Sequence, residues 1–184
     1  MLAVAAALRA AGDAPPATEG EVTAALVCAR ACFWQNDGFA ASMELLATHG
    51  VASARVGTAV SRVLRAFWKG SFDPTLIDGV VVGDVDASPL LRCIITHMDD
   101  AAAVAELYLG LRTLGTSETV RATVLSEGGA GLMLRTLDHH ATCGEVTVAV
   151  CEALRSLCAK AQNPFARALV NAHALTALLS VMDV

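Results

Sequence analysis

Apolar residues recur along much of the chain at intervals of three and four, which is the spacing of one face of an α-helix. Three such stripes superimpose on one another: Leu107, Leu111 and Leu114; Val150, Leu154 and Leu157; and Val60, Leu64 and Phe67. Each stripe predicts a helix that buries one face against the rest of the protein. The alternating pattern of a half-buried strand is nearly absent. The chain is therefore expected to be all-α.

The stripes belong to a repeat of about 43 residues. The hexad Gly110-Leu-Arg-Thr-Leu-Gly115 returns 43 residues later as Ala153-Leu-Arg-Ser-Leu-Cys158. A second element at 129–137 returns at 172–180 with the same offset, and residues 88–96 form an earlier version of it. A period of this length is typical of helical repeats, in which each unit buries its apolar face against its neighbours.

One unit is expected to contain a short, a medium and a longer helix. Short first helices are predicted at 118–126 and 164–170, with the Gly128-Gly129 break before the second helix. We also expect Ser88 to cap a helix with Pro89 in its first position, and Asp99-Asp100 to cap the helix that begins near Ala101. The whole chain is read as one domain, with approximate units at 1–34, 35–68, 69–115 and 116–158 and a partial unit at 159–184.

Residues 75–83 are the least regular part of this pattern. Gly79-Val-Val-Val-Gly83 could be a strand followed by a glycine loop, which would suggest a nucleotide site near Gly83-Asp-Val-Asp86. The glycine and lysine pattern that cradles a phosphate is missing there. In register with the other units, residues 75–83 are instead the first helix of a divergent repeat.

The segment Ser126-Glu-Gly-Gly-Ala-Gly-Leu-Met-Leu-Arg-Thr-Leu137, followed by a helix at 146–157 that ends in Ala-Leu-Arg-Ser-Leu, resembles the armadillo repeat. The family pattern has a glycine-marked turn, a leucine-rich second helix and a third helix ending in Ala-Leu-x-Asn-Leu. The resemblance covers nearly the whole chain and is most specific at 88–184. It implies a right-handed α-solenoid of about four repeats, whose third helices line a concave groove that binds other proteins. HEAT repeats are similar, but the three-helix unit favours the armadillo type.

Partner-binding residues are expected on the concave face of the third helices: Arg62, Arg65, Leu109, Arg112, Thr113, Glu152, Arg155 and Ser156. Family members that clamp extended peptides carry an Asn where this chain has Ala66, Thr113 and Ser156, so importin-like clamping is not expected. The recurring arginines have two interpretations. They could form a basic ladder for an acidic peptide, or they could be solvated or paired with acids such as Glu106 and Glu152 on the same helix.

The repeat phase predicts a solenoid that is truncated at both ends, because residue 1 falls within a second helix and residue 184 at the end of another. The apolar end helix would then expose Leu175 and Leu179 as further partner-binding residues. Either the chain is a fragment of a longer solenoid, or neighbouring subunits cover its ends.

Composition narrows the partners and the compartment. The 184 residues are 55% hydrophobic and 17% charged, and the net charge of −5 makes nucleic acid an unfavourable partner. No apolar stretch reaches the length of a membrane span, so membrane insertion is not expected. The six cysteines form no Cys-x-x-Cys pair and are read as buried free thiols, which favours an intracellular location, the cytoplasm first, with cytoskeletal and nuclear sites also open.

No catalytic motif, metal-ligand spacing or cofactor motif stands out, so we expect neither an enzyme nor a bound cofactor. His49, His97, His139 and His140 end successive second helices, about one repeat apart, which is too far for a shared metal. The expected function is a non-enzymatic scaffold for protein–protein interaction. The alternative is a structural subunit of a large cytoskeletal, axonemal or organellar assembly, with its solenoid ends covered by neighbours.

Overall fold

The computed structural model describes residues 29, 32–33, 36–68, 86–159 and 164–171, and within these ranges every regular element is a helix. The elements in chain order are α3 (Gly38–Leu45), the π-helical turn η2 (Leu46–Gly50), α4 (Ala54–Trp68), α5 (Ser88–Thr96), α6 (Ala101–Leu114), α7 (Glu118–Ser126), α8 (Gly129–His139), α9 (Gly144–Leu157) and α10 (Pro164–Asn171). The all-α prediction is therefore confirmed for this part of the chain. None of its helices is both long and apolar enough to span a bilayer.

The repeat register predicted from the sequence is visible in the helix bounds. Helix α6 and helix α9 have the same length and are offset by 43 residues at both ends. Helix α7 has the predicted bounds, and α10 ends one residue later than expected. The predicted helix at 75–83 and the second-helix copy at 172–180 lie outside the described residues.

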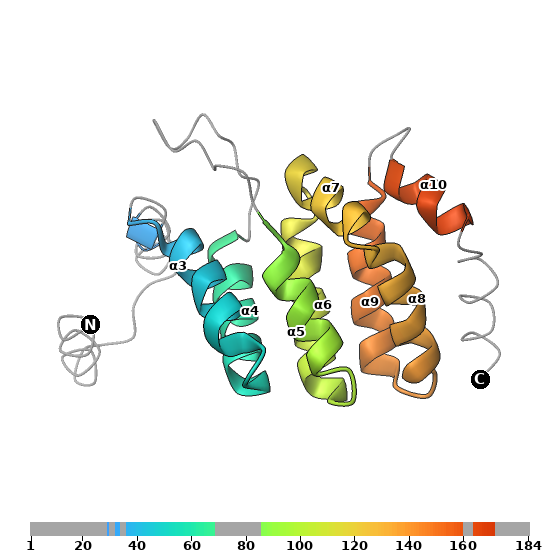
Figure 1. Cartoon of the computed structure of the whole chain (residues 1–184), viewed down its shortest axis with the longest axis horizontal. Coiled ribbons are helices and arrows are strands. Elements are labelled where there is room, and N and C mark those ends of the chain that lie inside the picture. Colours follow the sequence, from blue (N-terminus) through green and yellow to red (C-terminus); the bar gives the residue numbers. More distant parts are fainter. Residues whose placement is uncertain (1–28, 30–31, 34–35, 69–85, 160–163, 172–184) are drawn as a thin grey trace, which may run out of the picture.

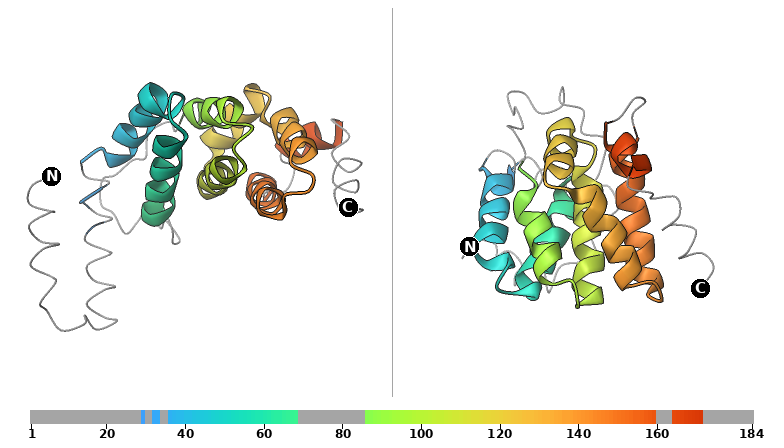
Figure 2. Two further views of the ribbon diagram at one scale, coloured as in Figure 1. Left: turned by 90° about the horizontal axis from the view of Figure 1, so that it is seen from below. Right: turned by 45° about the vertical axis from the view of Figure 1, so that its right-hand side comes forward.

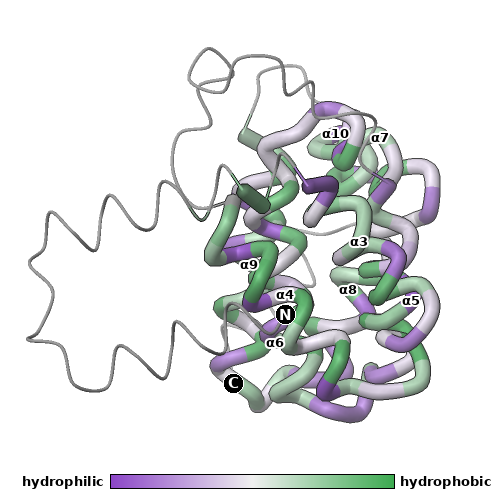
Figure 3. The backbone as a smooth tube through the Cα atoms, turned by 90° about the vertical axis from the view of Figure 1, so that its left-hand side faces the viewer, coloured by the Kyte–Doolittle hydropathy of each residue, from purple (hydrophilic) through white to green (hydrophobic). Residues whose placement is uncertain are grey.

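The helices are arranged in two layers. Helices α4, α6 and α9 form one layer, in which α6 packs against both of the others. The other layer contains α3 with η2, α5 and α8, and each of these packs on the next long helix of the chain (Figures 1 and 3). Helices α7 and α10 lie together at one end of the pairs. In the view from below, the helices of both layers succeed one another in chain order, from blue to red (Figure 2).

The core lies between the layers and is filled by the predicted stripes. Eight of the nine stripe residues are buried: Leu107, Leu111, Leu114, Val150, Leu154, Leu157, Val60 and Leu64. Phe67 is the exception, since it is only half-buried in the last turn of α4. Its ring stacks on Phe33, with centroids 4.5 Å apart and planes 12° apart, instead of entering the core between α4 and its neighbours.

The start of α5 differs from the sequence prediction. Ser88 is the first residue of the helix and not its cap, so Pro89 occupies the second position. The cap is formed from two residues upstream, where the Asp86 carboxylate accepts a hydrogen bond from the Ser88 backbone N–H at 2.9 Å. Hydrogen bonds from Ser88 lower the pKa of Asp86 below its usual value. A carboxylate is a stronger acceptor than a hydroxyl for a free helix N–H, which explains why Asp86 caps the helix in place of Ser88.

Two other turn predictions are confirmed. Asp100 caps α6, since its carboxylate accepts a hydrogen bond from the Ala103 N–H at 3.0 Å. Asp99 does not cap, and its carboxylate lies 3.1 Å from Nε2 of His139 instead. Gly128 ends the turn between α7 and α8 with φ at +71°, a left-handed conformation that favours glycine.

Candidate functional site

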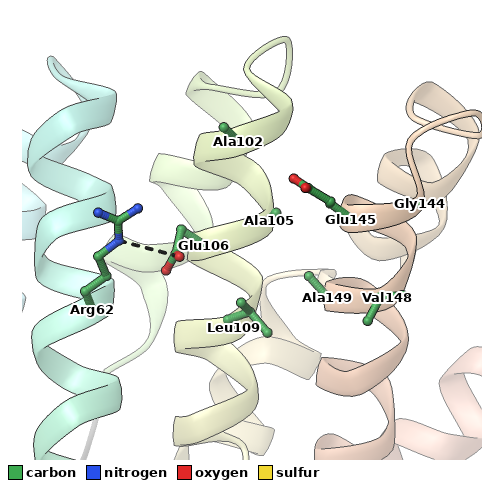
Figure 4. A pocket seen from close by; sticks show the side chains of 9 residues that line it. All are labelled: Arg62, Ala102, Ala105, Glu106, Leu109, Gly144, Glu145, Val148 and Ala149. Atoms are coloured by element: carbon green, nitrogen blue, oxygen red, sulfur yellow. Dashed lines mark ion pairs between the residues drawn. The ribbon is translucent and has the colours of Figure 1, made fainter.

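A groove of about 520 Å³ runs along the layer formed by α4, α6 and α9 (Figure 4). Its lining comes from all three helices: Arg62 of α4; Ala102, Ala105, Glu106 and Leu109 of α6; and Gly144, Glu145, Val148 and Ala149 of α9. The predicted residues Arg62 and Leu109 are both among them. The groove therefore lies on the helices for which the repeat pattern predicts a partner-binding face.

The repeat register explains why these side chains meet. Ala102, Ala105 and Glu106 have the spacing of one helix face, and they correspond to Glu145, Val148 and Ala149 at the 43-residue offset. The same face of two equivalent helices therefore lines the groove. Its floor is made mostly of alanine, whose small side chain leaves the space open. Sequence reasoning passed over these alanines because their signal lies only in the register.

Ion pairs cross from each long helix to the next. Arg65 of α4 donates to Glu106 of α6 at 2.8 Å, and Arg62 approaches the same carboxylate at 3.5 Å. Arg112 of α6 pairs in the same way with Glu152 of α9 at 2.5 Å. The sequence named these acids but placed the pairs within one helix, which is wrong. Helices packed side by side bring the long arginine side chain within reach of the neighbouring carboxylate.

Of the remaining predicted residues, two use their hydroxyl groups in hydrogen bonds within the protein, and one has an exposed side chain. The Thr113 hydroxyl donates to the Leu109 carbonyl at 2.9 Å, and the Ser156 hydroxyl donates to the Arg112 carbonyl at 2.7 Å. Arg155 is exposed and makes no ion pair within the described ranges. The end-helix residues Leu175 and Leu179 lie outside the described residues, so their exposure stays a prediction.

Two histidines connect successive units in a way that the sequence did not suggest. His97, which caps the end of α5, lies 2.7 Å through Nε2 from the Gly50 carbonyl at the end of η2. His140 caps α8 and makes the equivalent 2.7 Å contact with the Met98 carbonyl. A carbonyl only accepts, so Nε2 carries the proton in both. Carbonyls at the end of one second helix are thereby satisfied by the next unit.

The cysteines within the described residues are free thiols, but they are not uniformly buried. Cys93 is buried, and desolvation raises its pKa to about 11. Cys32 and Cys151 are exposed, and Cys143 and Cys158 are half-buried. Among these five thiols the prediction of burial holds for Cys93 alone, and Cys28 lies outside the described residues. Within the same ranges, no three His, Cys, Asp or Glu side chains gather closely enough to hold a metal ion.

Comparison of the chain with protein-family models, with curated proteins and with solved structures finds no match. The armadillo resemblance therefore rests on the register of the sequence alone. What the protein does has to be inferred from the groove itself.

Proposed function

We propose that the chain is an armadillo-like α-solenoid and acts as a non-enzymatic scaffold that binds another protein. The 43-residue register supports the solenoid, because it returns helices of the same length that pack side by side. The ion pairs and histidine contacts between successive helices support it as well, since they recur at offsets of 40 to 47 residues.

The observation that carries the binding function is apolar surface exposed within the groove. Val148 is 59% exposed and Leu109 is half-buried, and both stand on a floor of alanines. Apolar side chains in a hollow on rigid helices favour burial by a partner, because each removes apolar area from water on contact. The flanking charged residues resemble the polar rim of a protein interface.

Replacement of Val148 by Arg tests this function. The matched control is Ile95→Arg, because Ile95 is 53% exposed and lies on α5, in the other layer. Each full-length variant would be used to capture partners from native extract, and the captured proteins would be quantified by mass spectrometry. We expect Val148→Arg to reduce the recovery of specific partners at least tenfold, while Ile95→Arg leaves the recovery unchanged.

Two outcomes would overturn the proposal. Recovery that is insensitive to Val148→Arg would show that the groove is not the binding surface. Equal losses with both variants would point to a general defect and not to a site. The structural-subunit alternative predicts that the purified chain aggregates or needs its partners, whereas a self-standing scaffold is monomeric, and light scattering of the purified chain separates the two.

A further inference from the structure

Equivalent positions of the three long helices change in charge from one end of the layer to the other. Arg55, Ala102 and Glu145 are equivalent in the repeat register. About two turns further along each helix, Arg62, Leu109 and Glu152 are equivalent as well. At both levels the residue is basic on α4, apolar on α6 and acidic on α9. The layer is therefore polarised along the row of helices, and Arg62 and Glu145 are the charged residues of this series that line the groove itself.

The ion pairs within the protein do not neutralise the positive charge at the α4 end. Arg62 and Arg65 share the single carboxylate of Glu106, which leaves one positive charge in excess at the α4 end. The Arg62 side chain remains 68% exposed. Helix α4 has no acidic residue, and its third arginine, Arg55, is exposed and makes no ion pair within the described ranges.

The opposite end is net acidic, because Glu145 and Glu152 outnumber Arg155, the exposed basic residue in the last turn of α9. Glu145 lies in the first turn of α9 and is exposed, and its carboxylate extends across the groove toward α6 (Figure 4). It has no ion-pair partner within the described part of the chain. Glu152, two turns along, is paired with Arg112 but keeps 32% of its side chain exposed. Leu109 of α6 lies between the two ends, and Val148 adds apolar surface on the same helix as Glu145.

We infer that the groove receives an amphipathic helix of a partner protein, with its acidic end over α4, its apolar stripe over α6 and its basic end over α9. This inference rests on the proposed function and adds the chemistry and the direction of the partner. Opposite charges at the two ends select one orientation, because the reversed helix would place like charges together.

A helix fits the groove better than an extended peptide does. An extended strand needs donors and acceptors for its own backbone, but the Thr113 and Ser156 hydroxyls are already bonded to carbonyls of the protein. A helix satisfies its backbone internally and presents only side chains. Neighbouring packed helices are about 8–10 Å apart, so α4 and α9 are separated by about 16–20 Å. A helix covers that span in roughly 11–13 residues.

The test uses a synthetic helical peptide of roughly 13 residues, with glutamates in the first turn, leucines along one face and lysines in the last turn. A photo-crosslinking group is placed at the acidic end. The control peptide has the same composition, with the charges interleaved along the polar face. Binding to the full chain is measured by fluorescence anisotropy, and the cross-linked residues are identified by mass spectrometry.

We expect the polarised peptide to bind at least fivefold more tightly than the interleaved one and to cross-link to α4. Glu145→Arg should weaken its binding roughly three- to tenfold, an effect reduced by salt. In the double variant Arg55→Glu/Glu145→Arg the cross-link should move to α9. Ile95→Arg serves as the control variant and should change neither quantity.

Equal binding of the two peptides, no measurable binding of either, or cross-links spread over both ends would overturn the inference. Loss of partner capture in Val148→Arg would still support the proposed function in that case, so the two failures are distinguishable. A dimer that dissociates on Glu145→Arg would identify a second copy of the chain as the occupant, which also contradicts the inference.

Discussion

Ser61 and Gly110 meet where α4 packs against α6, and the contact leaves no room for a larger side chain. A Cβ atom at position 110 would overlap the Ser61 hydroxyl oxygen and lie 3.3 Å from the Ser61 Cβ. The Ser61 hydroxyl is fully buried and has no hydrogen-bond partner within the described residues. The close approach of the two helices therefore depends on glycine at 110, at the expense of an unsatisfied hydroxyl.

This contact predicts a compensating pair of substitutions. Gly110→Ala should destabilise the protein by about 1–3 kcal/mol, because the added methyl group overpacks the helix contact. The double variant Ser61→Gly/Gly110→Ala has glycine on α4 and the small side chain on α6. It should therefore recover most of the stability that Gly110→Ala loses. Urea denaturation of the parent protein, the two single variants and the double variant measures the effect. If the losses of the two single variants simply add, the side chains are not in contact.

At the scale of a single helix, α6 is the element on which most of the fold converges. It packs against α4, α5 and α9. Leu111 faces the core and is fully buried, whereas Leu109 is half-buried on the groove. The Tyr108 hydroxyl and the Thr136 hydroxyl of α8 form a 2.8 Å hydrogen bond, which joins the long helix to the second layer. One face of α6 therefore packs in the core, and another lines the groove.

Alanine substitutions separate these faces. Leu111→Ala should reduce the free energy of unfolding by about 2–5 kcal/mol, the usual cost of a cavity in a packed core. Leu109→Ala removes a side chain that water already reaches, so we expect a loss below about 1 kcal/mol. Thermal or chemical denaturation of both variants gives the comparison. Equal losses would mean that the helical phase is wrong.

The sequence predicted the elements much better than the contacts between them. Helix bounds follow from local signals, such as the apolar stripes, the Asp100 cap and the Gly128 turn, and the structure has them at those places. The partner of Arg65 lies 41 residues away, on a helix whose distance and rotation are set by packing. The alanine floor of the groove has no local signature either. Only the register of the repeat could have indicated it.

At the scale of the whole molecule, the account depends on one geometric claim: α4, α6 and α9 stand side by side and turn equivalent faces toward a common groove. The ion pairs Arg65–Glu106 and Arg112–Glu152 both run between neighbouring members of this row. The groove, its charge polarity and the proposed partner all require that arrangement. A different placement of α4 would leave only α6 and α9 to form the surface.

The distance between positions 55 and 145 tests this claim most directly. Spin labels on genetically encoded amino acids at Arg55 and Glu145 avoid the free cysteines, and pulsed electron–electron resonance measures their separation. With two interhelical spacings of about 8–10 Å, we predict one narrow distribution centred at roughly 20–25 Å once the label arms are included. A distribution centred beyond about 35 Å, or one without a defined maximum, would contradict the common groove.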